Sequence, residues 1–479
     1  MAMTSDQHAA ESAATTQAWS TGGSGFGYEV PLTAGLPLGG FVQLVTDDGA
    51  VHLGQLLSGT VAMRPGPDGT TTRVMEGEGI LLGDRTAAFG NARIGPAEAP
   101  LIQRRPPAAR EGEAVLTIGG LRDAPDIPAT LRAAAFNRHT FLCGQSGFGK
   151  TYALGLLLEQ LVLRTGLRLL VLYPNGDYRH LATTRPEVDT PTAEAYRRAA
   201  EGTQVLAEGA DDGEALRIRL RDLGPDGQAA VLQLDPLRDR EEYNEFLHFV
   251  EAGTWGSASE VLQGLSELGS ATGEALRMRL ENLRIGAMAL WAGRTGRSVV
   301  DRWAEDRPRA LVADLSGFAE RRERVAVALA VLQGLWARRT RREPCLLVVD
   351  EAHDLCPASP ADELQERVLD LFIRVAGEGR KYGLHLLLAT QRPAKLHANV
   401  LSQCDNVVLL RVNSAADRAQ LQEQFSFAPA GLVELAGRFR QGEALLAGPI
   451  TPFPLLARFG RRITPEGGSD PPTDWASDR

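Results

Sequence analysis

The segment FLCGQSGFGKTYALGLLLEQLVL places glycines, a lysine and a threonine at the spacing of a phosphate-binding loop. The pattern G-x-x-x-x-G-K-T follows an apolar run that we expect to be a strand, and it opens a long predicted helix. Glycines let successive backbone N–H groups turn toward one anion, and the amino end of the helix adds partial positive charge. A glycine turn without a ligand is the alternative interpretation. The residues expected to contact the nucleotide are Gly144, Gln145, Ser146, Gly147, Phe148, Gly149, Lys150 and Thr151.

A second chemical signal is the acidic pair in CLLVVDEAHDL, where Asp350 and Glu351 follow an apolar strand. Two adjacent carboxylates there are costly without cations, so a metal site is the natural explanation. We expect Asp350 and the Thr151 hydroxyl to support Mg²⁺, and Glu351 to orient and deprotonate a water. Lys150 should reach the β- and γ-phosphates. The predicted reaction is hydrolysis of ATP, although acidic pairs at strand ends are common where no phosphate loop accompanies them.

Two further residues extend this predicted site. Gln391 ends the apolar run LLLAT, so we expect it beside the nucleotide, where its amide could report the γ-phosphate. A simple strand-end cap is the alternative. Arg380, in GEGRKYG, precedes the same strand and should lie at the opposite edge of the sheet. It could reach the site of an adjacent subunit as an arginine finger, or it could be a surface cation.

The order of apolar and polar segments predicts the domains. Residues 1–24 are rich in Ala, Ser, Thr and Gly and are expected to be disordered. Residues 25–122 contain short β segments typical of a small β-barrel. Residues 123–463 alternate between apolar strands and helices, as in an α/β domain with a mostly parallel sheet. We expect strands at 139–143, 167–172, 229–234, 310–315, 345–349, 384–389 and 406–411, a helical insertion at about 238–306, and a flexible tail at 464–479.

Composition narrows the class of protein. The 479 residues carry a net charge of −9, which argues against an extended nucleic-acid-binding surface and confines any DNA contact to a small basic region. The four cysteines show no zinc-like spacing. No apolar stretch reaches the length of a membrane span, and the amino terminus has no signal architecture. We therefore expect a cytoplasmic protein that does not act at a membrane.

Several motifs together resemble the HerA branch of the HerA/FtsK superfamily of ring-forming DNA-pumping ATPases. They are the G-x-x-x-x-G-K-T loop, LYPNGDY, VVDEAH, EGRKYG and ATQRPAKLHANVLSQCDNVVLLRVNSAAD, and the resemblance covers about residues 28–460. It implies an N-terminal β-barrel, a RecA-like P-loop NTPase core with a helical insertion, and a homohexamer that moves along double-stranded DNA through a central pore. It also implies a partner, either a NurA-like nuclease in DNA end processing or an effector in phage defence.

By motif position, the resemblance gives the ATPase roles above to Lys150, Thr151, Asp350, Glu351 and Gln391. Arg380 matches the finger that acts on a neighbouring subunit, and Arg138 matches a second family arginine of that kind. Tyr173 stands where the family usually has an acid on the second strand. That change either alters the coupling of hydrolysis to DNA or only the packing beside the site. Two other functions remain open, an ATP-gated scaffold that controls a partner effector and a secretion-type translocation ATPase.

Overall fold

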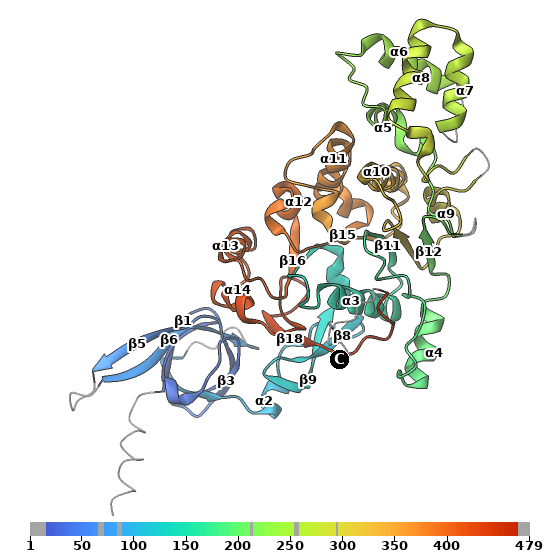
Figure 1. Cartoon of the computed structure of the whole chain (residues 1–479). Coiled ribbons are helices and arrows are strands. Elements are labelled where there is room, and N and C mark those ends of the chain that lie inside the picture. Colours follow the sequence, from blue (N-terminus) through green and yellow to red (C-terminus); the bar gives the residue numbers. More distant parts are fainter. Residues whose placement is uncertain are drawn as a thin grey trace, which may run out of the picture. The chain divides into compact units, whose positions relative to one another are not determined.

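The computed structural model describes residues 16–65, 71–83, 89–210, 214–252, 258–293 and 296–467 (Figure 1). The chain forms two compact units, each built from two stretches of sequence. The first contains the described residues up to Ala133 together with Asn406–Gly460, and the second contains Ala134–Asp405 with the described residues from Arg461 onward. The first unit therefore extends past the boundary at residue 122 drawn from the sequence.

The first unit contains a closed antiparallel barrel. Its strand order is β2-β1-β7-β3-β4-β6-β5, and an additional pairing of β2 with β6 closes six strands while β5 pairs with β6 alone. Closure leaves the six barrel strands without open edges. Phe26, Tyr28 and Leu44 fill the interior. The strands are β1 (Gln17–Gly22), β2 (Gly25–Pro31), β3 (Phe41–Thr46), β4 (Val51–Leu56), β5 (Thr60–Pro65), β6 (Thr71–Leu82) and β7 (Asn91–Pro96).

Strand β1 corrects the prediction that residues 1–24 are disordered. Its residues pair with both β2 and β7, and Ala18 is fully buried in the barrel core. The Trp19 ring lies against Gly27, where a side chain larger than hydrogen would clash. Local composition missed this strand because its partners lie elsewhere in the chain. Residues 1–15 are outside the described part.

The rest of the first unit is a second antiparallel arrangement with short helices. From residue 406 onward, strand β16 pairs with β17, β17 with β18, β18 with β8, and β8 with β9. Its elements are α2 (Ala99–Gln103), β8 (Val115–Leu121), β9 (Ala124–Arg132), β16 (Cys404–Leu409), α13 (Ala415–Gln424), α14 (Ala430–Leu435), β17 (Glu443–Ala447) and β18 (Leu455–Phe459), with 3₁₀ turns η2 (Leu32–Ala34) and η10 (Ala436–Arg438).

The second unit is built on a parallel sheet, as the sequence predicted. Its strand order is β12-β13-β11-β14-β15-β10. Four of its strands are buried along their whole length, which explains why they appear in the sequence as continuous apolar runs. The strands are β10 (His139–Cys143), β11 (Arg168–Tyr173), β12 (Gln204–Ala207), β13 (Ala310–Asp314), β14 (Cys345–Val349) and β15 (Leu384–Thr390). Short β12 was not predicted.

Helices cover both faces of this sheet. Figure 1 shows α10 and α11 on one face and α3 on the other. These three are α3 (Lys150–Arg164), α10 (Arg321–Ala337) and α11 (Glu363–Glu378). The shorter helical segments are α4 (Thr190–Ala199), α12 (Ala398–Leu401), η3 (Ala133–Asn137), η4 (Leu220–Leu223), η6 (Arg339–Arg341), η7 (Ala352–Asp354), η8 (Gly379–Tyr382) and η9 (Pro393–Lys395). Among the described residues, no helix has both the length and the apolarity to cross a bilayer.

A group of helices is inserted between β12 and β13, as the fold-class prediction required. It comprises α5 (Gly224–Val231), α6 (Arg240–Ala252), α7 (Ala258–Leu268), α8 (Ala271–Asn282), η5 (Ile285–Ala287) and α9 (Val299–Glu305). Helix α5 corrects the strand predicted at 229–234. A short apolar run fits either structure, and here Pro225 and Asp226 in the first turn favour a helix.

The end of the described chain is held against helix α3. Arg462 and Glu159 form an ion pair whose side chains are both fully buried, with 2.8 Å between Arg462 Nε and Glu159 Oε1. Glu159 also accepts from the backbone N–H groups of Ile463 and Thr464. A Cβ at Gly155 would lie 2.4 Å from the guanidinium carbon, so a larger residue there would displace Arg462. Thr464 is completely buried, so the tail predicted to be flexible from residue 464 is packed up to Gly467; residues 468–479 are outside the described part.

Replacing Arg462 with methionine should lower the free energy of unfolding by about 3–5 kcal/mol, because Glu159 would become a buried charge without its partner. Urea denaturation of the purified protein measures this loss. The double variant Glu159→Gln with Arg462→Met should recover part of it. Arg277→Met, which breaks exposed ion pairs on α8, is the control and should change stability little. An equal effect of the two arginine changes would contradict the assignment.

Candidate nucleotide-binding site

The carboxyl ends of three neighbouring strands bring the predicted site residues to one edge of the sheet. Val349 on β14 pairs with Leu388 on β15, and Cys143 on β10 pairs with Thr390 on β15. The residues that follow these strands therefore lie side by side. They are the phosphate loop after β10, the acidic pair after β14, and Gln391 after β15. In open parallel sheets, ligands bind at this edge.

The phosphate loop joins β10 to helix α3. Gly147 has φ of 79° and Gly149 has φ of 88°, left-handed values that favour glycine. Gly149 is the N-cap of α3, so the backbone turns directly into a helix whose first residues are Lys150 and Thr151. The amide of Gly144 bonds to the carbonyl of Thr390, which anchors the loop to β15. The arrangement presents backbone N–H groups and a helix amino end to an anion.

Lys150 lies between the two carboxylates of the acidic pair. Its ammonium group bonds to Asp350 Oδ1 and lies 3.0 Å from Glu351 Oε1. The Lys150 side chain is only 6% exposed and that of Asp350 is fully buried. Burial alone would lower the pKa of Lys150, but attraction to Asp350 and Glu351 outweighs it and raises the pKa, so the lysine is charged. A triphosphate must therefore compete with two carboxylates for this cation.

Glu351 has one oxygen ready for another partner. Its Oε1 faces Lys150, whereas Oε2 is buried and makes no hydrogen bond with any described residue. Such an orphaned acceptor is costly to bury unless a ligand or water completes it. Glu351 also has a left-handed φ of 46°, a strained conformation for a residue with a side chain. A cavity of about 50 Å³ lies beside Asp350 and Glu351, large enough for water, and Arg321 and Arg324 of α10 also line it.

Two residues that the sequence analysis did not select contact this centre. His353 Nδ1 lies 3.0 Å from Thr390 Oγ1 and 3.4 Å from Glu351 Oε2. Thr390 is the last residue of β15, and its hydroxyl accepts from the backbone N–H of Arg392. Burial lowers the pKa of His353, with neighbouring Asp354 and Glu351 opposing that effect. The signals available in the sequence were the histidine of DEAH and the hydroxyl immediately before Gln391.

Tyr173, the residue that departs from the family pattern, is part of the support for Asp350. Its buried hydroxyl accepts from the backbone N–H of Asp177, and its ring packs edge-on against Tyr178 with 4.5 Å between centroids. The Tyr178 hydroxyl lies 3.4 Å from Asp350 Oδ2. Burial raises the pKa of both tyrosines, so both phenols are neutral. Tyr173 thus takes no charge into the site, and it packs against Tyr178, whose hydroxyl lies beside Asp350.

The remaining Asp350 and Thr151 oxygens fit a hard cation. Carboxylate and hydroxyl oxygens are ligands that Mg²⁺ prefers, and the ion commonly keeps water and phosphate oxygens as its other ligands. Within the described ranges, no group of three or more His, Cys, Asp or Glu side chains is placed to hold a metal unaided. An ion at Asp350 and Thr151 would therefore depend on the triphosphate for part of its shell.

Arg138 and Arg380 lie at the other edge of the sheet. Arg138 immediately precedes β10 and Arg380 lies in η8, before β15. Both guanidinium groups bond to Asp405 Oδ2, at 3.1 Å and 3.2 Å. Strands of five to seven residues separate them from the phosphate loop by roughly 20 Å. Neither arginine can reach the nucleotide of its own chain, which is the position expected for Arg380 from sequence.

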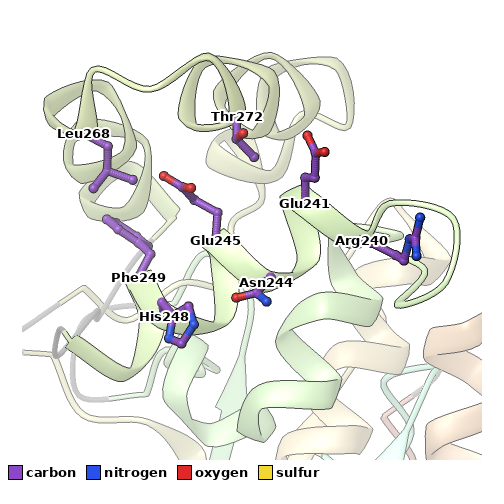
Figure 2. A pocket seen from close by; sticks show the side chains of 8 residues that line it. All are labelled: Arg240, Glu241, Asn244, Glu245, His248, Phe249, Leu268 and Thr272. Atoms are coloured by element: carbon purple, nitrogen blue, oxygen red, sulfur yellow. The ribbon is translucent and has the colours of Figure 1, made fainter.

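A larger hollow, of about 810 Å³, lies between α6, α7 and α8 in the helical insertion. Figure 2 shows Glu241 and Glu245 on α6 directed toward the helices above them and Phe249 beside Leu268. Its lining includes none of the site residues predicted from the sequence. The residues with the spacing of a phosphate-binding site lie instead at the sheet edge.

Comparisons with known proteins agree with this geometry. Residues 116–333 match the family model described as the central domain of helicase HerA, and residues 295–412 match the model of the ATPase family associated with various cellular activities. The DNA double-strand break repair helicase HerA of Sulfurisphaera tokodaii is 30% identical over 128 residues, which are 27% of this chain and 25% of that protein. A probable HerA of the same description from Methanocaldococcus jannaschii is 30% identical over 129 residues, again 27% and 25%.

The matched segment thus spans about a quarter of these relatives' length. Among solved structures, VirB4 of Thermoanaerobacter pseudethanolicus is similar with a TM-score of 0.49 and 16% identity, covering 74% of this chain and 98% of that one. The conjugative coupling protein TrwB has the same TM-score, 14% identity, and coverage of 75% and 93%.

The fold and the site define a P-loop ATPase with a RecA-like core, a helical insertion and an N-terminal β-barrel. Within that class, the chain is similar to the HerA-like ATPases of the HerA/FtsK superfamily.

Replacing Glu351 with glutamine should reduce ATP turnover by about 10²–10⁴-fold, because the amide cannot take a proton from water. ATP should remain bound, since the neutral side chain competes less for Lys150. Lys150→Ala should abolish turnover and weaken binding as well. Steady-state hydrolysis and binding of a fluorescent ATP analogue separate the two effects. Glu366→Gln, which changes an exposed glutamate on α11, is the control. Normal turnover by the Glu351→Gln variant would exclude Glu351 as the base.

Proposed function

We propose that this protein is a double-stranded DNA translocase in which ATP hydrolysis drives movement of DNA through a ring of six copies. The observation that carries the proposal is the separation of Arg138 and Arg380 from the phosphate loop of their own chain. Arginine fingers commonly complete such sites from a neighbouring subunit. The arginine pair lies at one sheet edge and the nucleotide site at the other. This separation suits a head-to-tail ring, in which the arginine pair of one subunit meets the nucleotide site of the next subunit at every interface.

Within one subunit, we assign the steps to the residues at the carboxyl edge. The phosphate loop binds the triphosphate, and Lys150 leaves the carboxylates to contact the β- and γ-phosphates. Glu351 Oε2 accepts a proton from water while the water oxygen attacks the γ-phosphorus and the bond to the β-phosphate oxygen breaks. Gln391 contacts the γ-phosphate and reports its loss. Mg²⁺, held by Thr151 and Asp350, would neutralise charge on the phosphate oxygens.

The acidic composition is compatible with a DNA substrate. A net charge of −9 disfavours DNA on the outer surface, so we place the duplex in the central channel, where a few basic residues per subunit would be repeated around the ring. The HerA relatives are described as double-strand break repair helicases, which supports duplex DNA as the substrate class. A NurA-like nuclease or a defence effector would be the partner that uses this movement.

Linear duplex DNA should raise the ATPase rate several-fold, and the stimulation should fall as salt is raised because phosphate contacts release counterions. Hydrolysis is measured with linear duplex, single-stranded DNA and no DNA, while light scattering gives the mass of the assembly. A hexameric mass with duplex-specific stimulation is expected. A lasting monomer, or a rate that responds to a co-expressed effector and not to DNA, would contradict translocation and favour an ATP-gated scaffold.

Mixed assemblies test whether Arg380 acts between subunits. Arg380→Ala alone should lower turnover by about 10³-fold or more, as loss of an arginine finger does. Mixing it with Glu351→Gln should restore part of the activity, because some interfaces then combine an intact Arg380 with an intact Glu351. The control is Arg440→Ala, mixed with Glu351→Gln in the same way. Arg440 is exposed and lies outside the arginine pair and the nucleotide site. Absence of recovery at every mixing ratio would rule out the intersubunit role.

A further inference from the structure

Among the described residues, His353 is a polar neighbour of the free Glu351 oxygen. His353 Nδ1 lies 3.4 Å from Glu351 Oε2, and the same nitrogen lies 3.0 Å from Thr390 Oγ1. Thr390 is fully buried and accepts from the Arg392 N–H at 3.0 Å. A hydroxyl that already accepts one hydrogen bond still has its own hydrogen to donate. The ring nitrogen can therefore be the acceptor of that hydrogen.

This hydrogen bond determines whether Glu351 Oε2 is available to accept a hydrogen bond from water. While Thr390 donates to Nδ1, the neutral ring carries its hydrogen on Nε2, 3.7 Å from Asp354 Oδ1. Nδ1 then has no hydrogen to give to Glu351, so Oε2 stays available for water. If Thr390 no longer donates, the hydrogen can reside on Nδ1 and occupy Oε2. The charged groups facing the ring are Glu351, Asp354, Arg392 and Lys395.

The loop that follows Gln391 is attached to the same segment by its backbone. Pro357 and Leu396 form an antiparallel bridge. The Ala358 N–H donates to the Lys395 carbonyl at 2.8 Å, and the His397 N–H donates to the Cys356 carbonyl at 3.1 Å. The segment after Glu351 is therefore joined to both sides of Gln391, through side chains to Thr390 before it and through the backbone to residues 395–397 after it.

We propose that Thr390 is a positioning residue: its hydrogen bond to His353 Nδ1 holds the neutral ring in the tautomer that leaves Glu351 Oε2 free for water. Because Thr390 immediately precedes Gln391, the same hydrogen bond links the general base to the loop that contacts the γ-phosphate. The inference rests on the proposed role of Glu351 as the base. It adds a coupling path within one subunit, which is distinct from the arginines that act between subunits.

A matched pair of variants tests the path. Thr390→Val removes the donor at similar size, whereas Thr390→Ser keeps it. We expect Thr390→Val to lower kcat about tenfold with the KM for ATP within twofold, because the hydrogen on His353 Nδ1 then occupies Glu351 Oε2, and Thr390→Ser to keep a near-normal kcat. His180→Leu, at an exposed histidine, is the control.

A double variant gives a further readout that packing alone would not produce. Adding His353→Leu to Thr390→Val should raise kcat above that of Thr390→Val alone, because the ring that blocked Glu351 Oε2 is then absent. A normal kcat for Thr390→Val, a Ser variant as impaired as the Val variant, or additive losses in the double variant would each overturn the proposal. If the double variant fails to fold, the Val and Ser variants at Thr390 decide.

The Glu351→Gln variant in the same assay separates the two levels of inference. If it is inactive while Thr390→Val is normal, only the positioning role fails. If it retains turnover, the proposed base is wrong and the coupling path falls with it.

Discussion

One buried cation between two buried carboxylates organises the catalytic edge of this ATPase. Lys150, Asp350 and Glu351 come from the ends of two different elements, and almost none of their charge is exposed to solvent. Buried charges of this kind are stable only while each has its partner. The ends of β10 and β14 must therefore stay in register, which the continuous parallel pairing through β15 provides. A triphosphate that binds here must compete with both carboxylates for Lys150.

The parallel sheet also explains why functional groups occupy two distant places. Strands that all run the same way send their carboxyl ends to one edge and their amino ends to the other. The phosphate loop, acidic pair and Gln391 follow strands, so they gather at the first edge. Arg138 and Arg380 precede strands, so they gather at the second, where Asp405 binds both. The distance between the groups is thus a property of the topology and requires no special local structure.

Much of this arrangement follows from sequence because the signals are local. The G-x-x-x-x-G-K-T loop, the acidic pair after an apolar run and the barrel followed by an α/β core were all foreseen. Features that depend on distant partners were not. Strand β1 is defined by its pairing with β2 and β7, and the region 229–234 was wrongly expected to be a strand because a short apolar run fits either structure. The contact of His353 with Thr390 joins residues 37 positions apart, which no local pattern encodes.

The packing of the chain's last described segment against α3 has a consequence for biogenesis. Glu159 lies on the helix that begins at the phosphate loop, but the arginine that neutralises it follows 303 residues later in the chain. During synthesis this helix therefore carries an acidic group that it cannot bury until Arg462 has also been made. Products that terminate between the two residues will have a poorly packed helix, which favours their degradation.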